Sequence, residues 1–418
     1  MPIIPKTHFT GFSPNATVRD IVDGTTAVLF PWKWRTWQYG SSAEKIEEYL
    51  QIFFQTKHAK TFDSGRTALF FALQALGIKE GDEVLVQAYT CIVVTNAIRF
   101  TGATPVFVDV NDNYNINSKE CKKKITPKTK AIIVQHTFGL PADIEALVDI
   151  AKEQDIKIIE DCAHAYGVTH NNQLLGTFGD ISIFSFGGEK VVSAIRGGFC
   201  ITNDDALGEK IATYHDNLQH VPKKAILQHL LKYPIFIIGK WLYSIKIGKI
   251  LFFFSKKLHI TSRIISKREA KGKKDTIYPA TFPNILAKIA LRQVRLFDSI
   301  KEHRRIIAAY YDKELKNRHI TKPKDTTKGE HGYLRYTIQV DDPKKLHAYA
   351  KKRRILLGNW YNTVVAPVKP KERTTGYIKG SCKHAEKISK KSVNLPTNRY
   401  ITLTSVKYIV DTINTYKP

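Results

Sequence analysis

The chain has few of the residues that build cross-linked or metal-linked frameworks. Five cysteines occur among 418 residues, and no two of them have the spacing of a CxxC motif. Neither a disulfide framework nor a zinc site is therefore indicated, and a reducing cytoplasm is the compartment we expect. The N-terminal stretch MPIIPKTHFTGF lacks the apolar core and small-residue cleavage site of a signal peptide.

Acidic side chains are also scarce. The chain carries 38 Asp and Glu against 65 Lys and Arg, which gives a formal net charge of +27. This balance favours an anionic partner, whether nucleic acid, anionic lipid or a phosphorylated small molecule, and charge alone does not choose among them. The apolar share of 43% is typical of a globular protein, and the length predicts two units with cores of their own.

Uninterrupted apolar runs long enough to cross a membrane are missing. The longest candidate, Pro234–Phe254, is broken by Lys240, Lys246 and Lys249, whereas a spanning helix needs about 20 predominantly apolar residues. Two interpretations of this run stay open. It forms an apolar hairpin that packs on the rest of the fold or on a partner subunit, or it forms an interfacial helix that contacts a membrane surface.

The second interpretation depends on charge. Residues 219–275 carry fourteen Lys or Arg against two acids. On a helical projection Lys246, Lys249, Lys256 and Lys257 share one arc, as an interfacial helix requires, although Phe253 lies inside that arc.

What the sequence does contain, from about Lys60 to Asn203, is an alternation of β-branched runs and helical windows. This pattern predicts an α/β fold with a mostly parallel sheet of the seven-stranded type, buried on both faces by helices. In such sheets ligands bind beyond the carboxyl ends of the strands. The predicted strands are 83–86, 105–108, 131–135, 156–160, 181–185 and 198–202, and they are followed by Tyr89, Asp109, His136, Asp161 and the loop FGGEK.

Three segments in this region carry candidate chemistry. In FDSGRTALFFALQALGI, Ser64, Gly65 and Arg66 open a helix that is apolar nearly all round, and such an N-terminus suits a phosphate, although SG also precedes many ordinary helices. In IIEDCAHAYG, two acids, Glu160 and Asp161, stand at the end of a strand, and one of them either binds a protonated ring nitrogen or caps the next turn. In FSFGGEK, Ser185 ends a strand and Lys190 follows, either as a solvated charge or as a reactive amine.

Together with Tyr89, which follows a predicted strand, these segments supply, in order, a phosphate cradle, an aromatic ring, a partner for a ring nitrogen and an amine, which is what a pyridoxal phosphate site needs. The chain resembles the DegT type of pyridoxal phosphate-dependent aminotransferases, within fold type I. The resemblance is strong over about Trp37–Asp204 and loose from Pro283 onward. Its matching segments are SGRTALFFALQALGIKEGDEV, TGATPVFVDV, YNIN, TPKTKAIIVQHTFGLPADI, EDCAHAYG, GTFGDISIFSF, Lys190 and RGGFCITND.

The resemblance implies a role for each matched residue. Lys190 would form the Schiff base with pyridoxal 5'-phosphate and move the proton, and Asp161 would pair with the pyridine nitrogen. The other implied cofactor contacts are the phosphate site at Ser64, Gly65, Arg66 and Ser185, the ring of Tyr89 over the pyridine face, and His164 near the phenolic oxygen. No metal is implied.

The sequence departs from the family at three places. Arg66 replaces the usual threonine of the SGT step, and GGEK replaces the commoner PTK, which leaves Glu189 without a family counterpart. The segment Tyr278–Pro283 aligns with the family's GYNYRM, whose Asn reaches the phosphate of a neighbouring subunit, but neither that Asn nor its Arg is present.

The implied activity is the transfer of an amino group from an amino acid, glutamate or glutamine, to a keto sugar on a nucleotide diphosphate, for amino-sugar, cell-surface polysaccharide or glycan biosynthesis. The implied assembly is a homodimer with active sites at its interface. Two alternatives remain: a scaffold or regulator with this fold and no transferase activity, and a basic protein that binds a membrane surface or nucleic acid. Nucleic acid is the partner that we expect least.

We expect three parts along the chain. Residues 1–215 form an N-terminal arm and the large cofactor-binding domain, residues 216–278 a basic apolar insertion, and residues 279–418 a smaller α/β domain. The expected location is the cytoplasm, at the inner face of the membrane if the lysines of this insertion contact lipid.

Overall fold

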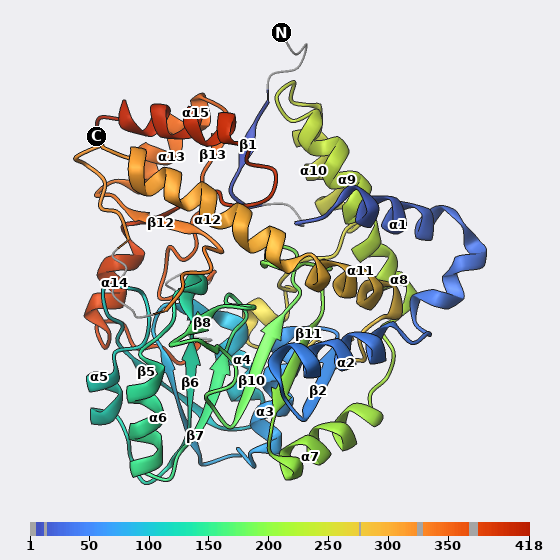
Figure 1. Cartoon of the computed structure of the whole chain (residues 1–418), viewed down its shortest axis with the longest axis vertical. Helices are drawn as coiled ribbons and strands as arrows, with labels where there is room; N and C mark the ends of the chain where they lie inside the picture. Colours follow the sequence, from blue (N-terminus) through green and yellow to red (C-terminus); the bar gives the residue numbers. More distant parts are fainter. Residues whose placement is uncertain (1–5, 12–14, 276, 324–328, 368–374) are drawn as a thin grey trace.

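A seven-stranded sheet dominates the computed structural model, which describes residues 6–11, 15–275, 277–323, 329–367 and 375–418 (Figure 1). The strand order is β2–β11–β10–β7–β6–β3–β5, and β11 alone among these strands runs against the others. The strands are β2 (His58–Phe62), β3 (Glu83–Gln87), β5 (Thr104–Val108), β6 (Thr129–Gln135), β7 (Lys157–Asp161), β10 (Ile181–Ser185) and β11 (Gly198–Thr202).

The predicted mostly parallel α/β sheet is therefore confirmed. Each of the six predicted runs is a strand, with ends that agree to within two residues. The seventh strand, β2, was not predicted because its sequence HAKTF is polar at alternate positions. It lies at the sheet edge, where Lys60 pairs with Glu47 at 2.9 Å between Nζ and Oε2.

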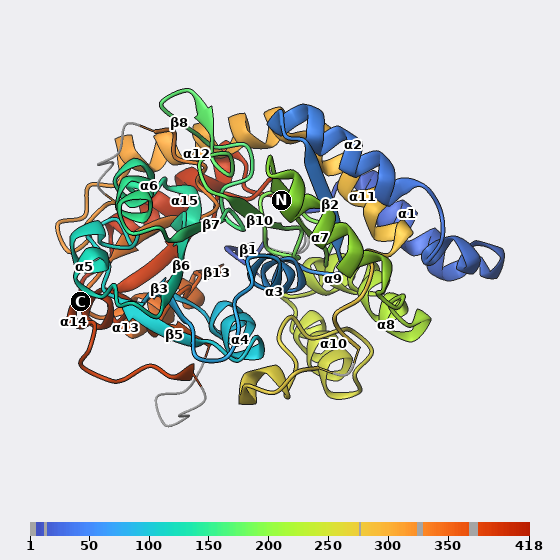
Figure 2. The same ribbon diagram turned by 90° about the horizontal axis from the view of Figure 1, so that it is seen from below.

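Both faces of the sheet are covered, because successive strand side chains point to opposite sides. Val84 and Val86 pack with α3 (Gly65–Ala75) and α4 (Ile92–Phe100), while Leu85 packs with α5 (Ser118–Lys123) and α6 (Ile144–Glu153). Figure 2 shows α3 and α4 on one side of the strands and α6 on the other. This double burial explains why the strands read as continuous apolar runs.

The C-terminal part has a smaller sheet and a core of its own. Strand β12 (Tyr336–Gln339) pairs antiparallel with β15 (Ser392–Leu395), and helices α12 (Phe297–Glu314), α13 (Pro343–Lys352) and α15 (Leu403–Asn414) pack around them. Residues 284–314 form two helices, α11 (Asn284–Arg295) and α12, which meet at Leu296. The boundaries of the three predicted parts, at 215 and 278, stay predictions.

Residues 223–257 form three helices, α8 (Lys223–Leu230), α9 (Lys232–Trp241) and α10 (Ile247–Lys257). Helices α9 and α10 form a tight hairpin, since a Cβ added to Gly248 would lie 1.9 Å from the carbonyl oxygen of Gly239. Among the described residues no helix is both long and apolar enough to cross a bilayer.

The remaining elements are short or peripheral. They are β1 (His8–Phe9), α1 (Val18–Leu29), η1 (Pro31–Trp37), α2 (Ser42–Phe54), β4 (Thr90–Cys91), η2 (Thr137–Gly139), β8 (Thr169–His170), β9 (Gln173–Leu174), α7 (Asp205–Asp216), η3 (Glu269–Lys271), β13 (Ile355–Leu356), β14 (Val365–Ala366) and α14 (Lys383–Ser389). Strand β1 pairs with β13, which attaches the N-terminal arm to the C-terminal part.

Candidate active site

A cavity of about 490 Å³ lies where β6, β7 and β10 end. Its walls come from these strand ends, from the N-terminus of α3, from residues 229–265 and from residues 359–367. Seven of the eight candidate cofactor residues line it: Ser64, Gly65, Arg66, Asp161, His164, Ser185 and Lys190.

Glycines allow the N-terminus of α3 to lie close against the end of β10. The Ser64 side chain caps the helix by accepting from Thr67 N. A Cβ on Gly65 would lie 2.9 Å from the carbonyl oxygen of Phe184, and one on Gly198 would lie 2.2 Å from Gly65 N. These glycines let the helix start pack against Ser185, so that backbone N–H groups and two hydroxyls face one end of the cavity, an arrangement suited to an anion.

Lys190 opens onto the same cavity. Its Nζ lies 5.5 Å from the centre of the Trp360 ring. Burial lowers the pKa of the Lys190 amine, although the nearby carboxylate of Asp161 opposes that effect. A lowered pKa leaves more of the amine neutral, which is the nucleophilic form.

Asp161 is 4% exposed, and its Oδ1 accepts a hydrogen bond from Ala163 N at 3.0 Å. Burial raises its pKa, while the Ala163 N–H and Lys190 act in the opposite direction. A buried carboxylate of this kind is stabilised by a cationic N–H group, because that partner offsets the lost solvation. The observed environment therefore fits a protonated ring nitrogen.

His164 is held as a neutral donor. Its Nδ1 accepts from the backbone N–H of Phe138 at 3.2 Å, so the ring proton is assigned to Nε2. Burial, with Lys190 and Arg335 adding to it, holds the pKa of His164 well below its ordinary value. The Nε2–H group points to Tyr361 Oη, 3.5 Å away, and can donate to an oxygen in the cavity.

Tyr89 does not line the cavity, in contrast to the face-stacking position that the resemblance implies. It is fully buried, and its hydroxyl accepts from Tyr361 N at 3.0 Å. The rings of Trp360 and Tyr361 line the cavity instead, with Tyr361 packed edge-on against Tyr89 at 5.4 Å between centres. The aromatic wall is therefore supplied by the C-terminal part, with Tyr89 behind it.

Two cations near the α3 N-terminus are already paired. Arg66 binds the Glu269 carboxylate and the carbonyl oxygen of Ile264. The arginine that stands in place of the family's threonine therefore contacts the 219–275 segment. Arg196, just before β11, binds Asp63 through Nε at 3.1 Å and Nη2 at 2.8 Å.

Glu189, which has no counterpart in the resemblance, has a clear contact. It accepts from Arg335 Nη2 at 2.6 Å, and the same guanidinium donates to the carbonyl oxygen of Thr10. The loop that carries Lys190 is thereby tied to the residue just before β12 and to the N-terminal arm.

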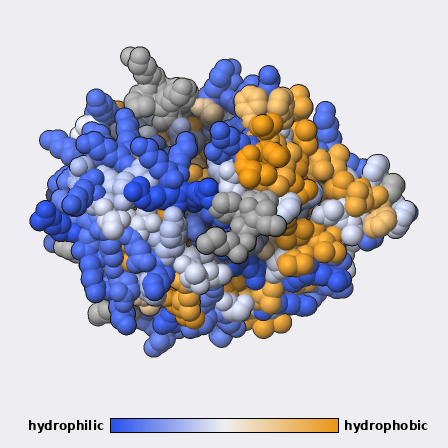
Figure 3. Space-filling view, turned by 90° about the horizontal axis from the view of Figure 1, so that it is seen from above, coloured by the Kyte–Doolittle hydropathy of each residue, from blue (hydrophilic) through white to orange (hydrophobic). Residues whose placement is uncertain are grey.

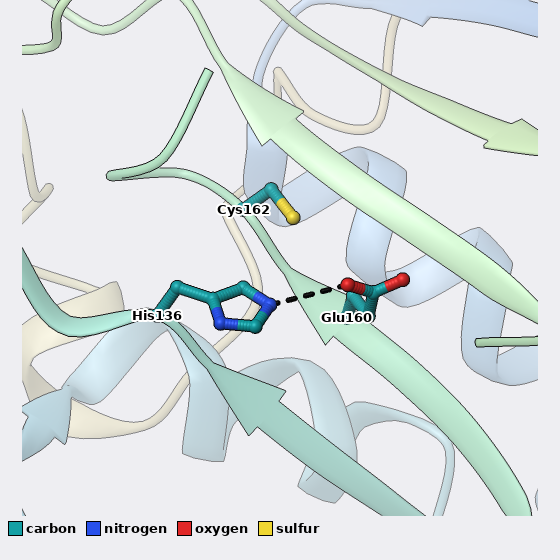
Figure 4. Close-up of side chains that lie close together, drawn as sticks. All are labelled: His136, Glu160 and Cys162. Atoms are coloured by element: carbon teal, nitrogen blue, oxygen red, sulfur yellow. Dashed lines mark hydrogen bonds and ion pairs between the residues drawn. The ribbon is translucent and has the colours of Figure 1, made fainter. Parts of the chain in front are cut away.

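Two other residues that follow strands have structural contacts. Asp109 accepts from the backbone N–H groups of His384 and Ala385 at the start of α14. His136 lies with Glu160 and Cys162 in a buried cluster with the spacing of metal ligands (Figure 4).

Hydrogen bonds within the protein account for that cluster. His136 Nε2 lies 3.2 Å from Glu160 Oε2, and its Nδ1 accepts from Ala142 N. Glu160 also accepts from the backbone N–H groups of residues 176, 178 and 179. Because these bonds use both ring nitrogens of His136 and both carboxylate oxygens of Glu160, we assign these two residues a structural role.

Several residues of the cavity were missed from the sequence. Lys232 and Arg263 belonged to a stretch known only to be basic, and Trp360 and Tyr361 to a segment without periodicity. Arg196 had a weak signal, because it precedes the double glycine that allows the close approach to α3.

Comparison with known proteins agrees with this geometry. Residues 26–231 and 262–414 match the DegT/DnrJ/EryC1/StrS aminotransferase family. The GDP-perosamine synthase of Escherichia coli O157:H7 is 44% identical over 179 residues, which are 42% of this chain and 49% of that enzyme. The match thus spans about half the length of that relative.

Two further proteins are similar over nearly the whole chain. A pleiotropic regulatory protein of Geobacillus stearothermophilus is 29% identical over 379 residues, 90% of this chain and 89% of its own. The structure of S. venezuelae DesV with a ketimine intermediate superposes with a TM-score of 0.73 at 22% identity, covering 97% of this chain and 98% of DesV, and supports the fold. On its sequence match and its fold, this chain belongs to the DegT/DnrJ/EryC1/StrS aminotransferase family.

Proposed function

We propose that this chain is a pyridoxal phosphate-dependent aminotransferase that transfers an amino group from an amino acid to a nucleotide-linked keto sugar. The observation that carries the proposal is the shared cavity of Lys190, Asp161 and the α3 N-terminus. The name of the E. coli relative, a GDP-perosamine synthase, supports a nucleotide sugar as the substrate class.

When bound, pyridoxal phosphate supplies an aldehyde that condenses with amines and a ring that accepts electrons from an α-carbon. The N–H groups and hydroxyls at Ser64, Gly65 and Ser185 would hold its phosphate. Asp161 would hold the proton on its ring nitrogen, and His164 Nε2–H would donate to its phenolic oxygen. These roles fit the buried carboxylate and the neutral histidine in the cavity.

Lys190 has two tasks in this proposal. Its neutral amine would hold the cofactor, and the same amine would take a proton from the α-carbon of the amino donor and later give it back. Glutamate or glutamine is the proposed donor. The wall of Trp360 and Tyr361 would limit the access of water to this exchange.

A spectroscopic experiment tests the function. The purified chain is expected to show a cofactor absorbance band near about 420 nm, as lysine-bound pyridoxal phosphate does, and glutamate or glutamine should shift it. The product would then aminate one of a panel of nucleotide keto sugars, detected by mass spectrometry. A chain that binds the cofactor but responds to no amino donor would support the scaffold or regulator alternative and contradict this proposal.

We also propose a homodimer, with cytoplasmic location and a role in amino-sugar or surface-polysaccharide biosynthesis. Light scattering of the full chain would give twice the monomer mass of 47.5 kDa, and a monomeric mass would contradict the assembly.

A contact with a membrane surface is favoured by one further observation. Apolar residues gather on the face that carries α1, α9 and α10 (Figure 3). Trp241 is 66% exposed and Phe253 is 59% exposed. Exposed lysines of α10 and its N-cap lie beside them, namely Lys246, Lys249, Lys256 and Lys257. Apolar anchors next to cations suit an anionic lipid surface.

A further inference from the structure

One residue of the cavity lining belongs to a part of the chain that the family match leaves out. The two matched stretches end at residue 231 and resume at residue 262. Lys232 is the first residue of the intervening segment, it begins α9, and it lines the same cavity as Lys190. Any ligand contact made by Lys232 is therefore a property of this chain.

The cations on the cavity differ in their partners. Arg66 is paired with Glu269, and Arg196 with Asp63. In the described part of the chain, Lys232 makes neither a hydrogen bond nor an ion pair, although it is only 8% exposed.

Arg263 resembles Lys232 in lacking a partner among the described residues. It also lines the cavity, it has no ion pair among the described residues, and its buried Nε has no hydrogen-bond partner. Since a buried cation without a counter-ion is unfavourable, both side chains call for an anion from outside the chain.

The neighbouring His229 does not provide the negative charge that Lys232 and Arg263 lack. His229 Nδ1 lies 2.7 Å from Ser262 Oγ, and burial holds its pKa well below the ordinary value, so the ring is neutral. Burial also lowers the pKa of Lys232, to about 7, with Arg196 adding to the effect and Glu189 opposing it. An anion beside the amine would restore its charge, because an opposite charge favours the protonated form.

We propose that Lys232 and Arg263 bind a phosphate group in the cavity. The inference deepens the proposed function, on which it rests for the source of that phosphate, since both the cofactor and the nucleotide diphosphate of the substrate carry one. Among the described residues, five basic side chains line the cavity: Arg66, Lys190, Arg196, Lys232 and Arg263. Arg66 and Arg196 are paired with carboxylates of the chain and Lys190 lies near Asp161, so the excess positive charge is that of Lys232 and Arg263. A phosphate is therefore favoured over a neutral ligand.

The test compares Lys232→Met with a matched control, Lys240→Met. Lys240 lies on the same helix, and burial lowers its pKa to about 7 as well. Its Nζ, however, lies 4.1 Å from the centre of the Tyr400 ring, and it lines a different cavity. Both variants lose one amine of α9, but only Lys232 lines the cavity that holds Lys190, so a loss of affinity confined to Lys232→Met reports a contact with the ligand.

The first arm uses the full chain freed of cofactor and titrates it with pyridoxal phosphate and with pyridoxal. If Lys232 holds the cofactor phosphate, Lys232→Met weakens binding of pyridoxal phosphate by about 10-fold to 100-fold, the range for a charge-assisted hydrogen bond. Binding of pyridoxal stays unchanged, and Lys240→Met leaves both affinities as in the wild type.

The second arm uses the cofactor-loaded chain and titrates it with UDP and GDP by calorimetry. A similar loss here, with cofactor affinity intact, assigns Lys232 to the diphosphate of the substrate. If Lys232→Met leaves both arms unchanged, or weakens pyridoxal and pyridoxal phosphate equally, the proposal is overturned.

Failure of the proposed function would look different. A wild-type chain that binds no pyridoxal phosphate contradicts the function, while a Lys232-dependent affinity for UDP or GDP would still support the phosphate site. Thermal unfolding of Lys232→Met checks its fold. If that variant unfolds, Arg263→Gln, at a partly exposed position, tests the same wall with the same two titrations.

Discussion

The two walls of the cavity are built in different ways. On the sheet side, Asp161 and Ser185 are the last residues of β7 and β10, and Lys190 follows Ser185 in the next loop. Backbone N–H groups of Ala163 and Gly187 bind the side chains of Asp161 and Ser185. On the side of residues 229–265, Lys232 and Arg263 face the cavity without an ion pair among the described residues. The sheet wall therefore carries the groups for chemistry, and the helical wall carries groups that await a ligand.

The two walls also differ in how they relate to the family match. The sheet wall lies within the part of the chain that matches the family, while Lys232 lies in the segment that does not. A strand end is a rigid place for a reacting group, whereas an added helix can change the choice of ligand without disturbing that group. Substitutions on the two walls should then differ in which measurement they change.

Lys190→Ala is expected to have the largest effect. Loss of the amine removes both the attachment of the cofactor and the proton transfer, so transamination should fall by at least about 10⁴-fold. The yellow, borohydride-reducible species should disappear, as measured by absorbance and by mass spectrometry of the reduced protein. Persistence of that species in the variant would rule out Lys190 as the site of attachment.

The pH dependence of this reaction gives a second readout for Lys190. Because its pKa is lowered by burial, the neutral amine is present at lower pH than that of an exposed lysine. Covalent capture of pyridoxal phosphate should therefore rise with pH and level off below the pH at which surface lysines react. A profile that follows the surface lysines would contradict the assignment.

Asp161→Asn is expected to be the next most severe change. An amide carries no charge to keep a ring nitrogen protonated, so the rate should fall by about 1000-fold. Steady-state kinetics with the preferred amino donor would measure it. Asp155→Asn, at an exposed turn before the same strand, is the matched control and should keep wild-type kinetics. Equal rates for Asp161→Asn and the wild type would exclude the proposed role.

Glu189→Gln tests the link between the lysine loop and the C-terminal part. It leaves the Arg335 guanidinium, whose side chain is 5% exposed, without its carboxylate. The free energy of unfolding should fall by about 2 kcal/mol, as measured by urea denaturation. Glu209→Gln, on the exposed face of α7, should change it by less than about 0.5 kcal/mol. A Glu189 variant as stable as this control would show that the link does not stabilise the fold.

The smallest expected effect is on the apolar face. If this face contacts anionic lipid, Lys257→Gln should weaken binding to phosphatidylserine vesicles by about fivefold, since one such lysine contributes about 1 kcal/mol. Vesicle sedimentation would measure it, with Lys152→Gln on α6 as a control away from the patch. If the wild type does not bind the vesicles, the proposed lipid contact is contradicted, and a protein partner is the remaining occupant of this face.

Much of the sheet wall could be predicted because local signals and topology agree there. Buried parallel strands read as apolar runs, and the residues after them meet at one edge whatever the loops do. Lys190 and Asp161 needed only that rule and the order of the motifs. Tyr89 satisfied the same rule and yet lies behind Tyr361. The C-terminal part covers Tyr89 with the rings of Trp360 and Tyr361, and no local sequence pattern predicts that contact.

The helical wall could not be predicted for a different reason. Lys232 looks like any of the fourteen basic residues in 219–275, and only the packing of α9 against the fold buries it. The partner of Arg66, Glu269, is also about two hundred residues away in sequence. Pairings between distant segments depend on tertiary packing, which a single sequence does not display.

The guanidinium of Arg335 has a mechanical consequence. It holds Glu189, one residue before Lys190, and the backbone of Thr10 at the same time. One side chain, that of Arg335, therefore connects the N-terminal arm and the loop of Lys190 to the start of the small sheet. A protease that removed the arm would take away the Thr10 carbonyl that Arg335 binds, next to the loop of Lys190, while leaving every residue of the large sheet intact.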